Sequence, residues 1–79
     1  MKITLKYFGL IAEITNTAEE VLDINHPVEV GALRNLLAKK YAPLGSATYQ
    51  VAINHSIAGQ DRELNANDEV ALLPPFAGG

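Results

Sequence analysis

The sequence of 79 residues contains no cysteine. This absence excludes a disulfide framework, a thiolate zinc site and a thiol nucleophile, and it is consistent with a cytoplasmic location. Long apolar runs are also missing, because none approaches the roughly 20 residues that a membrane helix needs. The N-terminus begins with a strand-like pattern and lacks the apolar core and cleavage site of a signal peptide. We therefore expect a cytoplasmic protein that binds no membrane.

Basic residues are scarce: six Lys and Arg stand against nine Asp and Glu, for a net charge of -3. No basic cluster exceeds the pair Lys39-Lys40, whereas a nucleic-acid partner needs a basic face. A mildly acidic domain is better suited to a protein partner with a basic surface. His26 and His55 are far apart, and neither has a further ligand at metal spacing. We expect no metal, no bound cofactor and no catalytic constellation that would make the chain an enzyme on its own.

The residues that are present are typical of one small folded domain. Hydrophobic residues make up 48% of the chain and charged residues 19%, which argues against disorder. Apolar alternation predicts strands, and the helical spacing of Val30, Leu33, Leu37 and Tyr41 predicts one main helix with these residues in the core. The expected elements are strands at 2–8, 20–24, 49–53, 57–58 and 69–73, a helical turn at 10–15 and a helix at 30–41. This order predicts an α+β fold with one main helix packed on one face of a mixed sheet.

The last predicted strand contains the nearly continuous apolar run Val70-Ala71-Leu72-Leu73. Such a run predicts a central strand that is buried on both faces. An apolar patch for a protein partner is expected around its end, formed by Leu72, Leu73 and Phe76.

The C-terminus departs from the pattern of the domain. We divide the chain into a globular domain at 1–74 and an extended, flexible tail at 75–79, which reads Pro75-Phe76-Ala77-Gly78-Gly79. Prolines lack the N–H that a sheet ladder needs, so Pro74-Pro75 ends the sheet and directs the chain outward. Five extended residues span about 17 Å, and glycines without Cβ atoms can pass a narrow channel. A frayed terminus can also end in Gly-Gly, but it has no need of a rigid apolar lead. The tail therefore predicts a terminal carboxylate that enters another protein's active site and reacts there.

Several segments resemble the small, sulfur-carrying subunits of molybdopterin synthase, in the ubiquitin-like MoaD/ThiS family. The segments are residues 72–79 (LLPPFAGG), 3–9 (ITLKYFG), 30–37 (VGALRNLL), 51–54 (VAIN) and 67–71 (NDEVA). The resemblance spans nearly the whole chain in the right order, and the ending is its specific part. It implies a β-grasp, ubiquitin-like fold, which agrees with the predicted order of elements.

The resemblance also implies a mechanism in which Gly79 carries sulfur. An adenylating enzyme would join the Gly79 carboxylate to AMP, and a sulfur donor would convert it into a thiocarboxylate. The tail would then enter the large subunit of molybdopterin synthase, where sulfur would pass to cyclic pyranopterin monophosphate in molybdenum cofactor biosynthesis. Gly78 and Ala77 would allow threading, and Phe76 with Pro75 would anchor the tail. The large subunit would supply the catalytic groups, and the family analogy suggests a heterotetramer.

Three alternatives stay open at this point. A sulfur carrier for thiamine or another thio-product would share the fold and the Gly-Gly end. A ubiquitin-like protein modifier would use Gly79 to form isopeptide bonds with lysines. A plain interaction module would have an inert tail, so removal of Gly79 would leave its function intact.

Overall fold

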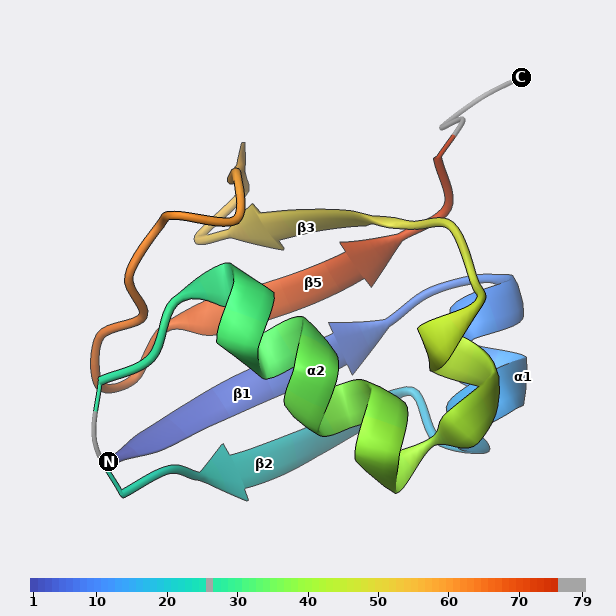
Figure 1. The fold of residues 1–79 in the computed structure, drawn as a ribbon, viewed down its shortest axis with the longest axis horizontal. Coiled ribbons are helices and arrows are strands. Elements are labelled where there is room, and N and C mark those ends of the chain that lie inside the picture. Colours follow the sequence, from blue (N-terminus) through green and yellow to red (C-terminus); the bar gives the residue numbers. More distant parts are fainter. Residues whose placement is uncertain (26, 76–79) are drawn as a thin grey trace.

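The computed structural model describes residues 1–25 and 27–75 of the chain (Figure 1). The elements are β1 (Lys2–Tyr7), α1 (Leu10–Thr15), β2 (Glu19–Asp23), α2 (Val30–Lys40), the 3₁₀ helix η1 (Ala42–Gly45), β3 (Gln50–Ile53), β4 (Ser56–Ile57) and β5 (Glu69–Leu73). The predicted bounds of α1 and β5 are confirmed, and the other predicted elements differ by one residue at one or both ends.

The five strands form one mixed sheet in the order β2-β1-β5-β3-β4. The first and last strands of the sequence, β1 and β5, pair in parallel at the centre, while the remaining neighbours are antiparallel. The main helix, α2, lies across one face of this sheet (Figure 1). This arrangement is a β-grasp, so the predicted fold class is confirmed.

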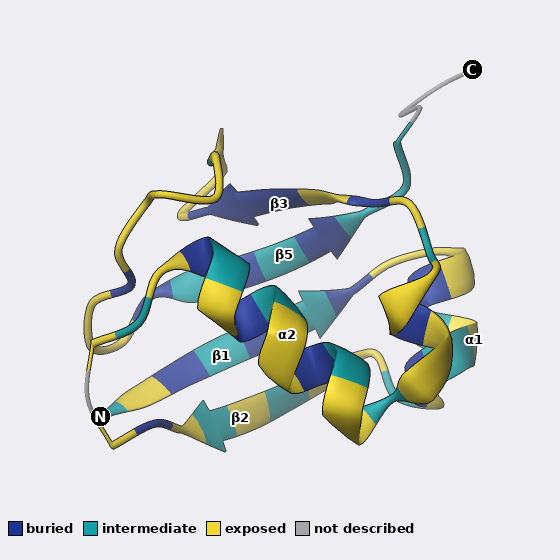
Figure 2. Ribbon diagram, in the orientation of Figure 1, coloured by how far each residue is buried: buried dark blue, intermediate teal, exposed yellow. Residues whose placement is uncertain are grey.

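The core lies between α2 and the sheet. One stripe of the helix supplies Val30, Leu33 and Leu37, each at most 1% exposed. Alternate positions of the strands face this stripe, which is why buried segments alternate with mostly half-buried ones along β1 in Figure 2. Full burial of each such aliphatic side chain contributes about 1.5–3 kcal/mol. The sheet contributes the buried side chains Ile3, Leu5, Tyr7, Val51, Ile53, Val70 and Leu72.

Two predictions about the core are wrong in part. The helix ends at Lys40, and Tyr41 has extended backbone angles; its side chain is half-buried and packs against the core instead of lying within it. The strand β5 is central as predicted, but only one of its faces is buried. Its other face carries the half-buried Glu69, Ala71 and Leu73, because the single main helix covers only one side of the sheet.

Candidate functional site

The C-terminal tail leaves the sheet at Pro74, which we call the root of the tail. This root is held by the turn that follows β1. The Phe8 N–H donates a hydrogen bond to the Leu72 carbonyl at 3.3 Å. Gly9 has φ 57 and ψ -132, angles that glycine adopts at no steric cost. A Cβ built on Gly9 would lie 3.1 Å from Cγ of Pro74. The half-buried Pro74 therefore packs directly on glycine backbone, which fixes where the chain leaves the sheet.

Of the predicted site residues, which all follow Pro74, the structure describes only Pro75. Pro75 is half-buried and directly follows Pro74. The remaining predicted tail residues lie outside the described part of the chain, so their roles stay predictions: Phe76, Ala77, Gly78 and Gly79. The prediction that Leu72 belongs to an apolar patch for a partner is wrong, because its side chain faces α2 and is 0% exposed. Leu73 is half-buried on the opposite face of the sheet.

A hollow of about 340 Å³ lies on the face of the sheet opposite the core. Ala71 and Ala52, which are register partners, contribute small side chains to the hollow, and Lys6 is the partner of Ala71 on its other side. The hollow reaches Leu73, the last residue before the root of the tail. Its lining residues are Lys6, Phe8, Ala52, His55, Ile57, Glu69, Ala71 and Leu73.

The hollow has apolar borders and a polar edge. Phe8 is 45% exposed and Ile57 is 64% exposed, and together they border the hollow with apolar surface. Glu69 Oε1 forms an ion pair with Lys6 Nζ at 3.2 Å, and Glu69 Oε2 lies 3.7 Å from His55 Nε2. An apolar centre with a charged rim is typical of a protein-docking surface. The sequence prediction missed this surface, although the alternation of β1 already places Phe8 on the outer face.

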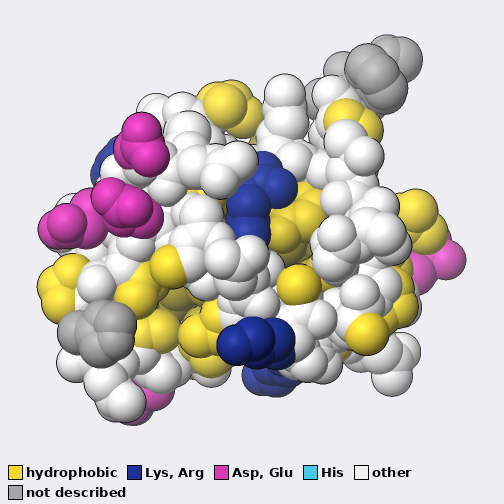
Figure 3. Space-filling model, viewed as in Figure 1, with side chains coloured by type: hydrophobic (Ala, Val, Ile, Leu, Met, Phe, Trp, Pro, Cys, Tyr) yellow, Lys and Arg dark blue, Asp and Glu magenta, His cyan; other side chains and the backbone are white. Residues whose placement is uncertain are grey.

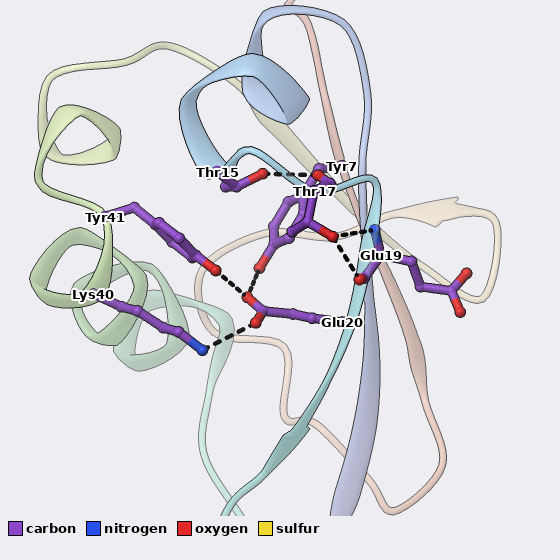
Figure 4. A network of polar contacts seen from close by, with 7 residues as sticks. All are labelled: Tyr7, Thr15, Thr17, Glu19, Glu20, Lys40 and Tyr41. Carbon is purple, nitrogen blue, oxygen red and sulfur yellow. Dashed lines mark hydrogen bonds and ion pairs between the residues drawn. The ribbon is translucent and has the colours of Figure 1, made fainter.

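A polar cluster joins the C-terminal end of α2 to β1 and β2 (Figure 4). The Tyr7 and Tyr41 hydroxyls donate to Oε1 of Glu20 at 2.5 and 2.9 Å, and Lys40 Nζ donates to Oε2 at 2.9 Å. Burial alone raises the pKa of Glu20, but the three hydrogen bonds together hold that pKa below its ordinary value. Burial of the Tyr7 side chain raises its pKa most, and the hydrogen bond to Glu20 raises it further. Each of these polar groups has a hydrogen-bond partner within the cluster, and the partners come from the end of α2 and from the sheet. The cluster therefore positions α2 on the sheet.

The described residues hold no group of three His, Cys, Asp or Glu side chains that could bind a metal ion. Asp68 is buried and structural: it accepts hydrogen bonds from Asn54 Nδ2 at 3.0 Å and from the Asn65 N–H at 2.7 Å. His26 lies outside the described residues, and His55 is exposed at the rim of the hollow. In this part of the chain no helix is long and apolar enough to cross a membrane.

Comparison with known proteins places these features in a family. The model of the ThiS family matches residues 5–79. A relative from Mycobacterium tuberculosis, described as the molybdopterin synthase sulfur carrier subunit, is 34% identical over 82 residues, covering 100% of this chain and 99% of the relative.

The solved structures that share the fold include the following two. One from Pyrococcus furiosus, provisionally assigned as molybdopterin converting factor subunit 1, has a TM-score of 0.89 at 22% identity and covers 96% of this chain and 99% of its own. SAMP1 from Haloferax volcanii, a small archaeal modifier protein, has a TM-score of 0.83 at 25% identity over 100% of both chains. These likenesses confirm the predicted ubiquitin-like β-grasp.

Proposed function

This chain belongs to the ThiS family, and from that premise we propose that it is a sulfur carrier whose C-terminal Gly79 donates sulfur in molybdopterin synthesis. One observation carries the proposal: similarity to a sulfur carrier subunit runs over the whole chain, and the family match includes the tail through to residue 79. The described fold supports it, because the root of the tail is fixed at Pro74 while the last glycines have no side chains to obstruct entry into a partner.

The proposed chemistry begins at the Gly79 carboxylate, which is a poor acyl donor as long as it is ionised. An adenylating enzyme joins it to AMP and releases pyrophosphate from ATP. A sulfur nucleophile at the sulfide level then displaces AMP and leaves a C-terminal thiocarboxylate. In the large subunit of molybdopterin synthase, the thiocarboxylate sulfur forms a bond to a side-chain carbon of cyclic pyranopterin monophosphate, while a carbon–oxygen bond at that carbon breaks and the oxygen leaves. Water then hydrolyses the acyl–sulfur link, which leaves the sulfur on the product and returns the Gly79 carboxylate. Acyl-adenylate and thiocarboxylate are the transient covalent states of the carrier in this scheme.

The carrier acts in this scheme as a non-catalytic subunit, with the large subunit supplying the catalytic groups. The hollow on the outer face is the surface we assign to this partner. It ends at Leu73, next to the fixed root of the tail, so a protein that covers the hollow lies where it can also receive residues 75–79. Phe76 and Pro75 anchor the tail in the partner, while Ala77 and Gly78 pass through its channel.

A single-turnover assay tests the proposal. The chain is prepared with a C-terminal thiocarboxylate and mixed with the large subunit and cyclic pyranopterin monophosphate, and molybdopterin is measured together with the carboxylate form of the carrier. We expect two carriers to be consumed for each molybdopterin, because the dithiolene contains two sulfur atoms. The matched control is a chain that lacks Gly79 and carries the thiocarboxylate on Gly78, which places the sulfur one residue short. Equal product from the untreated carboxylate form would refute sulfur donation by Gly79.

The likeness to the archaeal modifier protein favours one second candidate, a protein modifier that forms isopeptide bonds through Gly79. Incubation with ATP and cell extract distinguishes the two candidates. Conjugates of higher mass that require Gly79, in the absence of sulfur transfer, would replace the carrier proposal with this one. A carrier for thiamine or another thio-product would instead form the thiocarboxylate and leave cyclic pyranopterin monophosphate unchanged.

A further inference from the structure

A second cavity, of about 310 Å³, lies on the helix side of the molecule, away from the hollow on the outer face. It opens between α2, the segment after α2 and the start of β3. Four of its lining residues have small side chains or none, which leaves room beside the helix: Gly31, Ala38, Gly45 and Ala47. Figure 3 shows this face, with a basic side chain among hydrophobic atoms near its centre and the acidic side chains gathered elsewhere.

Arg34 is the basic residue that lines this cavity. Its Nη2 donates to the Tyr49 carbonyl at 3.0 Å, and its guanidinium carbon lies 4.4 Å from the centre of the Tyr49 ring. These contacts fix the plane of the guanidinium group. Its Nε is buried and has no hydrogen-bond partner, and within residues 1–25 and 27–75 no carboxylate pairs with Arg34. A guanidinium carries five N–H donors, and a buried donor without a partner costs free energy.

The Nε itself is buried, whereas the Arg34 side chain as a whole is only half-buried, so a ligand in the cavity would pair with the accessible part of the guanidinium, and the lining indicates its chemistry. Among the described residues that line the cavity, Arg34 is the one with a charge, and the amides of Asn35 and Gln60 are neutral groups that can donate hydrogen bonds. A planar guanidinium matches a planar carboxylate with two parallel hydrogen bonds. One positive charge balances one carboxylate, whereas a phosphate group carries up to two negative charges and the chain already has a net charge of -3. The volume is at the small end for ligand pockets, so a small acid, a side chain or a chain terminus would fit.

We propose that this cavity is a carboxylate-binding site, with the Arg34 guanidinium as its charged anchor and Asn35 and Gln60 as neutral donors. The proposal is independent of sulfur transfer, because it rests on the cavity alone. Two sources can supply the carboxylate. Another molecule is one, and the terminus of this chain is the other, since Gln50 follows Tyr49 and pairs with Leu73, directly before the tail.

Titration with sodium acetate, followed by NMR of the full chain at constant ionic strength with chloride as control, tests the site. We expect saturable shifts of the Arg34 Nε–H and of the Asn35 and Gln60 side-chain amides at an acetate concentration on the order of 10 mM. Arg34→Gln should weaken binding by about tenfold or more, because charge-assisted hydrogen bonds are lost. The matched control is Arg62→Gln, which removes the same charge from an exposed position outside the cavity.

Amide signals of residues remote from the cavity show whether Arg34→Gln is folded. Arg34→Lys retains the charge but loses the planar guanidinium group, and it should bind acetate less tightly than the original chain.

Amidation of the terminal carboxylate distinguishes the two sources of the carboxylate. Tighter acetate binding after amidation assigns the site to the chain's own terminus, and unchanged binding assigns it to another molecule. Shifts that do not saturate, that chloride reproduces, or that persist in Arg34→Gln would overturn the proposal.

Discussion

Substitution of Gly9 by alanine should destabilise the protein and disturb the root of the tail. Gly9 has φ 57 and ψ -132, the angles of the first central position of a type II′ turn. Backbone strain of this kind costs about 1–3 kcal/mol for a residue with a Cβ. The new Cβ would also lie 3.1 Å from Pro74 Cγ, so the proline must move as well. For a domain of this size, a loss of this magnitude lowers Tm by roughly 5–20 °C.

Urea unfolding followed by circular dichroism measures the effect. The chain has three tyrosines and no tryptophan, so a backbone signal is more useful than tryptophan fluorescence. Gly59→Ala is the matched control: a Cβ on Gly59 would have no heavy atom within 4 Å, and we expect its stability to change by less than about 0.5 kcal/mol. A Gly9→Ala variant as stable as the original chain, or a Gly59→Ala variant that loses as much, would contradict the claim that the angles of Gly9 and its contact with Pro74 specifically require glycine.

Three further predictions address the hydrogen-bond cluster, the core and the outer face. Glu20→Gln should cost about 1–3 kcal/mol at neutral pH, since three hydrogen bonds to a carboxylate are weakened. The folded-state pKa of Glu20 is lowered, so its contribution is present above the ordinary glutamate pKa and lost as pH falls through the folded value; unfolding of the variant should depend less on pH in that acidic window, and an identical slope would contradict this. Leu72→Ala should cost about 2–5 kcal/mol in urea unfolding because the side chain is fully buried, and a loss below 1 kcal/mol would argue against its place in the core. Ile57→Asp, in the hollow, should weaken binding of the large subunit in calorimetry about tenfold or more, whereas Val21→Asp, at a similarly exposed position on the opposite edge strand, should not; equal effects would remove the hollow from the interface.

Local pattern was sufficient to predict most of the elements of this fold. Apolar residues alternate strictly in β1 and recur at helical spacing in α2, so each element has one apolar face. The type of each element and the side that it turns to the core therefore follow from the order of its residues. The prediction failed at Tyr41, because the apolar stripe continues to this residue although the helix has ended at Lys40. The 3₁₀ turn Ala42–Gly45, which follows Tyr41 directly, was not predicted.

The candidate surfaces depend on contacts between distant segments, and the sequence prediction found them only in part. The chemistry of the tail could be proposed from residues 74–79 because they are consecutive. The hollow requires Ala71 to lie between Lys6 and Ala52, and this depends on the parallel register of β1 and β5. The carboxylate pocket likewise depends on Arg34 reaching Tyr49 from a different element. The burial of Asp68 also depends on its hydrogen bonds to Asn54 and Asn65, the first of which joins two distant segments.

The most direct test of the central claim is the intact mass of the chain after incubation with an adenylating enzyme of the ubiquitin-activating type, ATP and a sulfur donor. The account predicts that one oxygen is replaced by one sulfur in the full chain, that the change maps to Gly79 in the C-terminal peptide, and that a chain without Gly79 keeps its mass. An unchanged mass of the full chain, with the same enzyme preparation shown to be active on another carrier, would contradict the account.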